Sequence, residues 1–124
     1  MTSFTDLTVW QRAMDLIAEV HAITENFPAS DGSGLAKQLR SSSKSIVGNL
    51  AEGCGRYTFP DKANKFVIAR GECSETKGHL LVAVRLKFVT PERAARALEL
   101  TSEVGKMLSG LIKSCHRRSL ITNN

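Results

Sequence analysis

The sequence predicts an all-α protein, folded as an antiparallel up-down bundle of four helices in a single domain, 1–124. Apolar residues recur at intervals of three and four along four segments, and no alternating strand pattern competes with them. Short stretches rich in glycine, serine and proline separate the segments. A length of 124 residues also suits one domain. We expect helices at residues 6–27, 34–53, 59–87 and 91–117.

The first segment, residues 6–27, has two adjoining apolar stripes that together cover roughly half of the helix circumference. This is wide for a helix with one packed side, so we expect one stripe in the core and the other against a neighbour. We interpret Trp10 as a core residue rather than a binding hot spot. One stripe is Leu7, Trp10, Met14, Ile17 and His21, and the other is Val9, Ala13, Leu16, Val20, Ile23 and Phe27.

The other three segments begin after hydroxyl side chains that can cap a helix, namely Ser33, Thr58 and Thr90. Proline follows in the first turn of the last two. Gly71 and Gly78 lie inside the 59–87 helix and weaken it, so we expect close packing to compensate.

The end of the 34–53 helix reads SIVGNLAEGCGRYT and resembles a phosphate-binding loop only in its glycines. No lysine follows the second glycine, and no strand precedes the stretch, so both nucleotide-loop motifs fail. We interpret it as a packing and turn motif in which Gly53 and Gly55 supply left-handed or unusual angles where the helix stops and turns. Glu52 and Arg56 are spaced to pair with each other, and Asn49 is placed to bond across a helix interface.

The composition favours a reduced, cytoplasmic protein. The first residues lack the charged start and apolar middle of a signal peptide. No apolar run is long enough to cross a bilayer. Cys54, Cys73 and Cys115 are far apart and form no metal-binding pair, so we expect free thiols.

Several stretches in order resemble the small helical-bundle proteins encoded in intervening sequences of bacterial 23S rRNA genes, also called ribosomal protein-like. The resemblance covers nearly the whole chain. Its most specific parts are VWQRA, the GL-x-x-QLR run and N-[LI]-AEG-x-GR. The full stretches are FTDLTVWQRAMDL, ITENFP, GLAKQLRSSSKSIVGNLAEGCGR, IARGECSE and LTSEVGKMLSGLIKS.

The resemblance implies a homopentameric ring of four-helix bundles without known enzymatic activity. A related branch, the accessory protein of diversity-generating retroelements, is similar in fold and binds a reverse transcriptase and nucleic acid through a basic surface. Two departures from the family pattern make the middle helices more polar. Ser41 to Ser45 read SSSKS where the family usually has an apolar pair, and Thr76 stands where it usually has leucine.

The net charge of +5 is unevenly distributed, since the first 30 residues are acidic and the remainder is basic. This pattern suits head-to-tail self-association, a polyanionic partner, or an ordinary solvated surface. Phosphate contacts by such cations would be sensitive to salt and indifferent to base sequence. The candidate nucleic-acid-binding residues are Lys37, Arg40, Lys44, Arg56, Lys62, Lys65, Arg70, Lys113, Arg117 and Arg118.

Two other functions compete with nucleic-acid binding. One is a protein-interaction scaffold for a nucleic-acid-processing enzyme such as a reverse transcriptase. The other is an enzyme, for which Glu72, Glu75 and His79 share part of a helix face but form no Glu-x-x-His motif. Cys54 has no base paired with it in sequence. We therefore expect no catalytic residues, no metal site and no cofactor.

Overall fold

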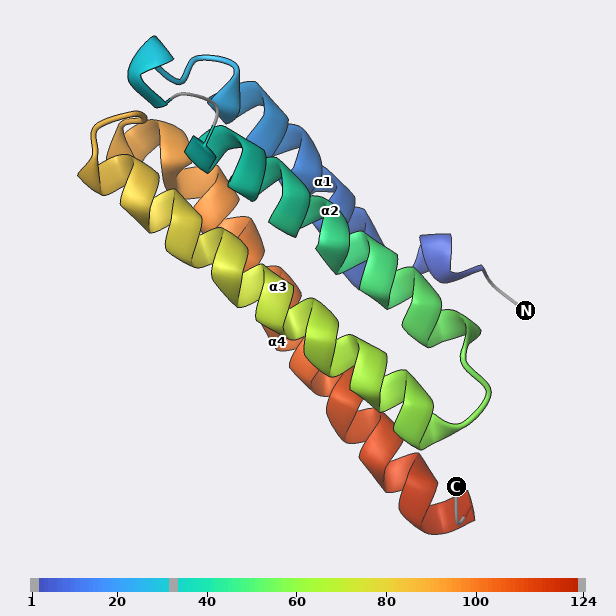
Figure 1. Cartoon of the computed structure of the whole chain (residues 1–124). Coiled ribbons are helices and arrows are strands. Elements are labelled where there is room, and N and C mark those ends of the chain that lie inside the picture. The colour runs from blue at the N-terminus through green and yellow to red at the C-terminus, as the bar shows by residue number, and fades with distance from the viewer. Residues whose placement is uncertain (1–2, 32–33, 123–124) are drawn as a thin grey trace.

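The computed structural model describes residues 3–31 and 34–122. Four long helices lie side by side in alternating directions (Figure 1): α1 (Thr8–Thr24), α2 (Gly34–Gly55), α3 (Phe59–Arg85) and α4 (Pro91–Thr122). Two 3-10 turns accompany them, η1 (Phe4–Asp6) and η2 (Ala29–Asp31). α2 packs on α3, α3 on α4, and α1 on both α2 and α4. The prediction of an all-α protein with four helices is confirmed, and no strand occurs in the described ranges.

The core lies where one stripe of each helix meets the others. In α1 the buried stripe is the one that contains Leu16 and Val20, both 0% exposed. The adjoining stripe stays partly open, and its Met14 is 45% exposed. Trp10 is half-buried, with its ring edge on Phe4 at 4.9 Å between centroids. The second stripe of α1 therefore adds Leu7 and Trp10 to the edge of the core, whereas Met14 stays largely open.

The helix boundaries differ from the expected ones in ways that the backbone explains. α1 begins at Thr8 rather than residue 6 because Leu7 is extended, with φ −68° and ψ 136°. α3 ends at Arg85 rather than residue 87 because Lys87 takes a left-handed φ of 64°. α4 continues to Thr122 instead of ending at 117, since no proline or glycine follows to stop it.

The helix starts confirm two of the expected caps. Thr58 and Thr90 each accept a hydrogen bond from the backbone amide three residues later, at 3.3 and 3.1 Å. Ser33, the third expected cap, lies outside the described residues. Asp31 does cap α2, because its two carboxylate oxygens accept from first-turn amides at 2.9 and 3.1 Å.

Gly53 is the glycine at which α2 and α3 approach closely. A Cβ placed there would lie 2.5 Å from a ring carbon of Phe66. The expectation of left-handed angles is wrong, since Gly53 and Gly55 both continue α2 without a positive φ. Close packing around Gly71 and Gly78 is also wrong, since a Cβ at either position would meet nothing within 4 Å.

The described helices include none that is both long and apolar enough to span a membrane.

Candidate nucleic-acid interface

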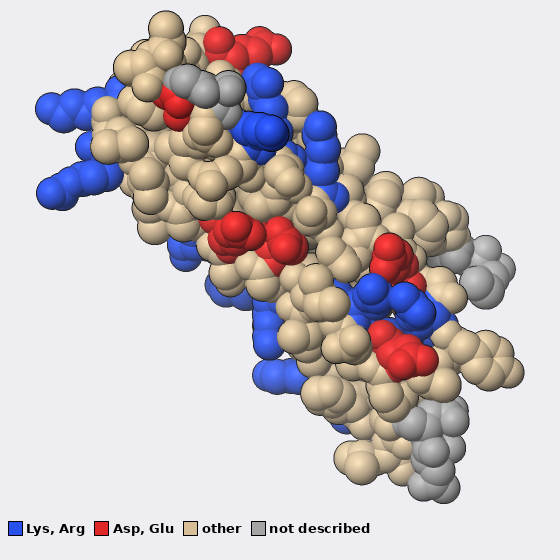
Figure 2. Space-filling view, in the orientation of Figure 1, with Lys and Arg blue, Asp and Glu red and all other residues tan. Residues whose placement is uncertain are grey.

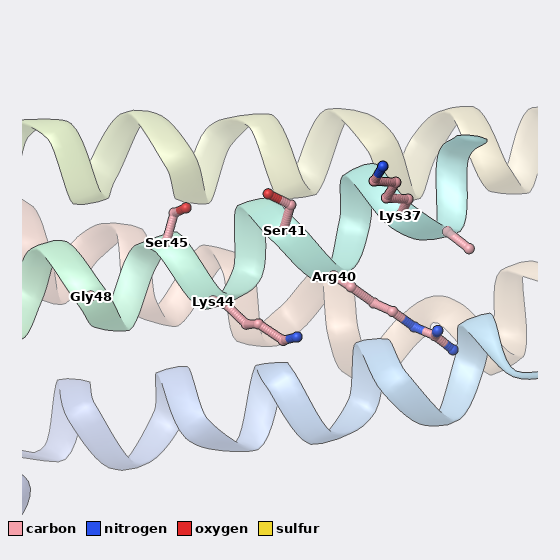
Figure 3. Close-up of a pocket in the computed structure, with 7 residues that line it drawn as sticks. Lys37, Arg40, Ser41, Lys44, Ser45 and Gly48 are labelled. Carbon is pink, nitrogen blue, oxygen red and sulfur yellow. The ribbon is translucent and has the colours of Figure 1, made fainter. Parts of the chain in front are cut away.

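The outer side of α2 carries the first basic surface, which we call the α2 face: Lys37, Arg40 and Lys44 with the small residues between them. These residues line a shallow hollow of about 750 Å³. Figure 3 shows Arg40 and Lys44 extending toward α1, whereas Ser41 and Ser45 point toward α3. Their spacings of three and four place the three cations on one side of the helix, as the sequence predicted.

Arg40 has a packing role besides its charge. Its Nε donates a hydrogen bond to the Thr24 hydroxyl at 2.8 Å, and Thr24 is buried at the end of α1. The same hydroxyl donates to the Val20 carbonyl at 2.7 Å. Arg40 therefore joins α1 to α2, and a charge reversal there would disturb the bundle as well as the surface.

Carboxylates lie beside the α2 face on its α3 side. Lys37, Glu72 and Glu75 together line a hollow between α2 and α3. Desolvation and the neighbouring Glu75 raise the pKa of Glu72 above its usual range. Negative charge this close to Lys37 weakens the attraction of a phosphate group to this part of the α2 face.

Three cations near the connection between α2 and α3 are engaged with that connection. Arg56 lies 3.9 Å from Glu52, which confirms the expected pair, but Lys65 is closer at 2.9 Å. The hydrogen bond and charge of Lys65 lower the pKa of the Glu52 carboxyl. Lys62 Nζ donates to the carbonyl of Cys54 at 3.0 Å. The Glu52 carboxylate thus offsets part of the positive charge that the sequence assigns to this hairpin.

Asn49 does not bond across a helix interface as expected. Its Nδ2 donates to the Ser45 carbonyl at 2.9 Å, within the same helix. The residue therefore satisfies its amide locally and leaves the contact between α2 and α3 to its neighbours.

A second basic surface lies between α3 and α4, and we call it the basic groove. It has a volume of about 590 Å³ and is lined by four cations, Arg70, Lys77, Lys106 and Lys113. Hydroxyl-bearing residues, two glycines and Cys73 line the rest, and the described residues that form it include no Asp or Glu. Arg70 Nη1 donates to the Ser109 hydroxyl at 3.3 Å, which fixes its position across the groove. Figure 2 shows Lys and Arg side chains in a row along the α3 edge of the molecule.

The basic groove combines predicted residues with residues that the sequence reasoning missed. Arg70 and Lys113 were candidates, but Lys77 and Lys106 were not. A signal was present, since each helix repeats a cation after seven residues, which returns it to the same side after two turns. The sequence alone does not show the register in which α3 packs on α4, and this register brings the two pairs of cations together.

The two remaining candidates lie near the end of α4. Arg117 is exposed, and the Arg118 guanidinium lies over the Phe59 ring, 5.7 Å from its centroid. Neither residue lines the basic groove, so Arg70 and Lys113 are the two of the ten candidates that do.

The thiols and carboxylates are possible nucleophiles and metal ligands, and the described residues favour neither role. Burial raises the pKa of Cys54 and Cys115, and that of Cys73 to about 11, so all three are protonated near neutral pH. Within residues 3–31 and 34–122, no group of three His, Cys, Asp or Glu side chains could hold a metal ion.

Comparison with protein families finds one family model that covers most of this chain. Residues 5–110 match the model of the 23S rRNA-intervening sequence protein family. The chain belongs to this family. The match confirms the resemblance seen in the sequence motifs. The last part of α4, with Lys113, Arg117 and Arg118, follows the matched segment.

A crystal structure has a similar fold: a protein of unknown function from the S23 ribosomal protein family of Bacteroides thetaiotaomicron VPI-5482. The TM-score is 0.77 at 24% sequence identity, over 86% of this chain and 99% of that one. At this identity the likeness supports the fold of the chain and nothing finer. No curated protein matches the chain.

Proposed function

We propose that this protein binds structured RNA, alone or in a nucleoprotein, by its phosphate backbone and without catalysis. The observation that carries the proposal is the basic groove, in which four cations gather with no carboxylate among the described lining residues. The family description associates the family with a 23S rRNA intervening sequence, and on that association we choose RNA among polyanionic partners. A protein of this kind would act in the cytoplasm.

The groove has the dimensions and chemistry of a backbone site. The two cations on each helix are seven residues apart, which corresponds to about 10 Å along the axis. Lysine, arginine and hydroxyl side chains are the usual partners of phosphate oxygens, and such contacts position a nucleic acid without reading its bases. Binding at the groove would therefore fall steeply with salt and depend weakly on sequence.

We also propose that several copies assemble as a homopentamer, the state that the family resemblance implies. The outer side of α3 exposes Val67, Ile68, Leu81 and Val82, each between 40% and 51%. Gly71 and Gly78 lie on the same helix with open space around them. An apolar helix surface with missing side chains suits close approach by another helix. Repeating the basic groove around a ring would strengthen RNA binding through multivalency.

The same surface of α3 supports a second candidate function, a scaffold for a nucleic-acid-processing enzyme. The resemblance to the accessory protein of diversity-generating retroelements favours a reverse transcriptase as that enzyme. A pull-down from nuclease-treated lysate distinguishes the two functions. Retention of one protein partner after nuclease treatment supports the scaffold, and loss of every partner supports RNA binding.

Fluorescence anisotropy with a labelled structured RNA, titrated over a salt series, tests the main proposal. The double variant Lys77→Gln/Lys106→Gln should weaken binding and reduce the slope of log affinity against log salt by roughly 1.4 to 1.8, since each lost phosphate contact contributes about 0.7 to 0.9. Arg85→Gln/Lys87→Gln is the matched control, because it also removes two positive charges, at exposed positions outside the groove. Equal affinities and slopes for all three proteins would contradict the proposal.

The α2 face requires a variant that spares packing. Lys44 is exposed, whereas Arg40 bonds to Thr24. Charge reversal at both Arg40 and Lys44 should weaken RNA binding, but only Lys44→Glu separates binding from folding. If Lys44→Glu binds RNA as the wild type does, the α2 face is not part of the RNA surface.

A further inference from the structure

The last turns of α4 extend past the connection between α2 and α3 (Figure 1), and a pocket opens at this end of the bundle. It has a volume of about 530 Å³. We call it the end pocket. Its walls come from η1, the start of α1, the end of α2, the start of α3 and the end of α4. Its apolar lining is Phe4, Leu7, Phe59, Phe66 and Leu111.

Phe66 forms the buried part of the end pocket because of the glycine opposite it. The side chain is only 4% exposed and lies against Gly53, where a Cβ would come within 2.5 Å of the ring. Any larger residue at position 53 would displace the ring. The glycine-rich end of α2 thus shapes a wall of the pocket, although it forms no phosphate loop.

The polar groups of the end pocket are cationic or neutral. Lys62 and Arg118 line it, and the described lining residues include no carboxylate. Lys62 Nζ uses one donor on the Cys54 carbonyl and has two more N–H groups. Arg118 lies over the Phe59 ring, which joins the cation to the aromatic wall. The site therefore combines an aromatic interior with positive charge.

We propose that the end pocket holds one unpaired nucleotide of a bound RNA, with the base among the phenyl rings and its phosphate on Lys62 and Arg118. Its volume falls within the usual range for small-ligand sites, about 300 to 1,000 Å³. Bases of single-stranded RNA stack on aromatic rings and on arginine guanidinium planes, and both are present here. Hydroxyl groups of Ser3 and Ser114 also line the pocket and can bond to a base edge.

This inference rests on the proposed RNA binding and adds a preference to it. Phosphate contacts in the basic groove would hold any structured RNA, whereas the end pocket would favour an RNA with an unpaired base near a helical segment. Stacking of one base on an aromatic side chain contributes about 1 to 3 kcal/mol, which corresponds to roughly 5- to 150-fold in affinity.

Two hairpin RNAs test the inference: one blunt, and one with an added two-nucleotide overhang that carries 2-aminopurine. The wild type should bind the overhang RNA at least 5-fold more tightly and change the 2-aminopurine fluorescence. Phe59→Leu keeps apolar volume but removes the ring, so it should lose this preference and leave the blunt hairpin unaffected. A preference retained by Phe59→Leu, or absent from the wild type while the blunt hairpin binds, overturns the inference and leaves the proposed function standing. Failure to bind either RNA would overturn both.

Phe4→Leu provides a second variant outside the four long helices, in case Phe59→Leu fails to fold. It should also reduce the overhang preference, and an unchanged preference counts against the inference. Trp10 is the single tryptophan and contacts Phe4 of the pocket lining, so its fluorescence reports on the end pocket through that ring. Uridine monophosphate should change that signal in a saturable way. Saturation by decanoate without any response to the nucleotide would assign the pocket to aliphatic acids and overturn the inference.

Discussion

The hydroxyl groups of Ser42 and Thr76 lie 2.8 Å apart in the core, where they join α2 to α3. Both side chains are nearly inaccessible, at 4% and 0% exposed. Thr76 also donates within its own helix to the Glu72 carbonyl at 2.9 Å. Ser42 lies in the stretch Ser41 to Ser45, and this stretch and Thr76 are more polar than the family resemblance implies. In the structure the two polar residues complement each other. A polar residue in one helix is satisfied by a polar residue in the next.

A double-mutant cycle on this pair should show coupling. Ser42→Ala or Thr76→Val alone should lower the free energy of unfolding by about 1 kcal/mol, because each removes the hydrogen bond between α2 and α3 and leaves the remaining hydroxyl only its bond within its own helix. The double variant should cost less than the sum of the two, since both polar groups are gone. Urea unfolding of the four proteins measures this. Strict additivity would show that the hydroxyls do not stabilise each other.

Gly48 and Gly53 should respond in opposite directions to replacement by alanine. Gly48→Ala should raise the free energy of unfolding by about 1 kcal/mol, because alanine favours helix and nothing lies within 4 Å of the new Cβ. Gly53→Ala should lower it by about 1 to 3 kcal/mol through the clash with Phe66. Thermal unfolding followed by circular dichroism compares the two variants directly. Stabilisation by both would mean that the Phe66 ring moves aside freely.

Lys87 holds the left-handed position that ends α3. Its φ is 64°, and the amide of Phe88 donates to the Ala83 carbonyl at 2.9 Å, as in a Schellman motif. Lys87→Gly should stabilise the protein by about 0.5 to 1 kcal/mol, since glycine adopts this angle without steric cost. Lys87→Ala is the control and should give no such gain, because it keeps the Cβ. Equal melting temperatures for the two variants would contradict this account.

The fold was predictable from the sequence because its main signal is periodicity, and the buried stripes of α1 and α4 repeat at every third or fourth position. Local caps were predictable where the residue stands at the helix start, as Thr58 and Thr90 do. The end of α3 was not, because no glycine marks it and a lysine takes the left-handed angle instead. Asp31 was missed because it caps α2 from within a 3-10 turn, at a distance of four and five residues.

The candidate site was less predictable, because proximity along the chain is a poor guide to charge on a bundle surface. Arg56 and Lys65 are close in sequence to other cations but lie against Glu52. Lys77 and Lys106 are far apart in sequence, and only the antiparallel packing of α3 on α4 brings them to one groove. Aromatic residues from η1 and α3 likewise meet at the end pocket without any shared sequence motif.

Cys73 should make the stability of the bundle depend on alkaline pH. Burial between α3 and α4 raises the pKa of its thiol from 9.0 to about 11, and Sγ donates to the Thr101 carbonyl at 3.2 Å. The folded protein thus holds its proton more tightly than the unfolded chain does. The stabilisation is fully present below pH 9.0 and is lost as the pH rises through about 11.

By pH 11 the loss should amount to roughly 2 kcal/mol relative to neutral pH, since each pKa unit corresponds to about 1.4 kcal/mol. Cys73→Ala lacks the thiol and should show a constant offset from packing but no such decline of its own. Urea unfolding of both proteins between pH 7 and pH 11 isolates the thiol, because Cys54, Cys115 and every lysine are common to the two. Parallel stability curves across that range would show that the Cys73 thiol ionises as readily in the folded protein as in the unfolded chain.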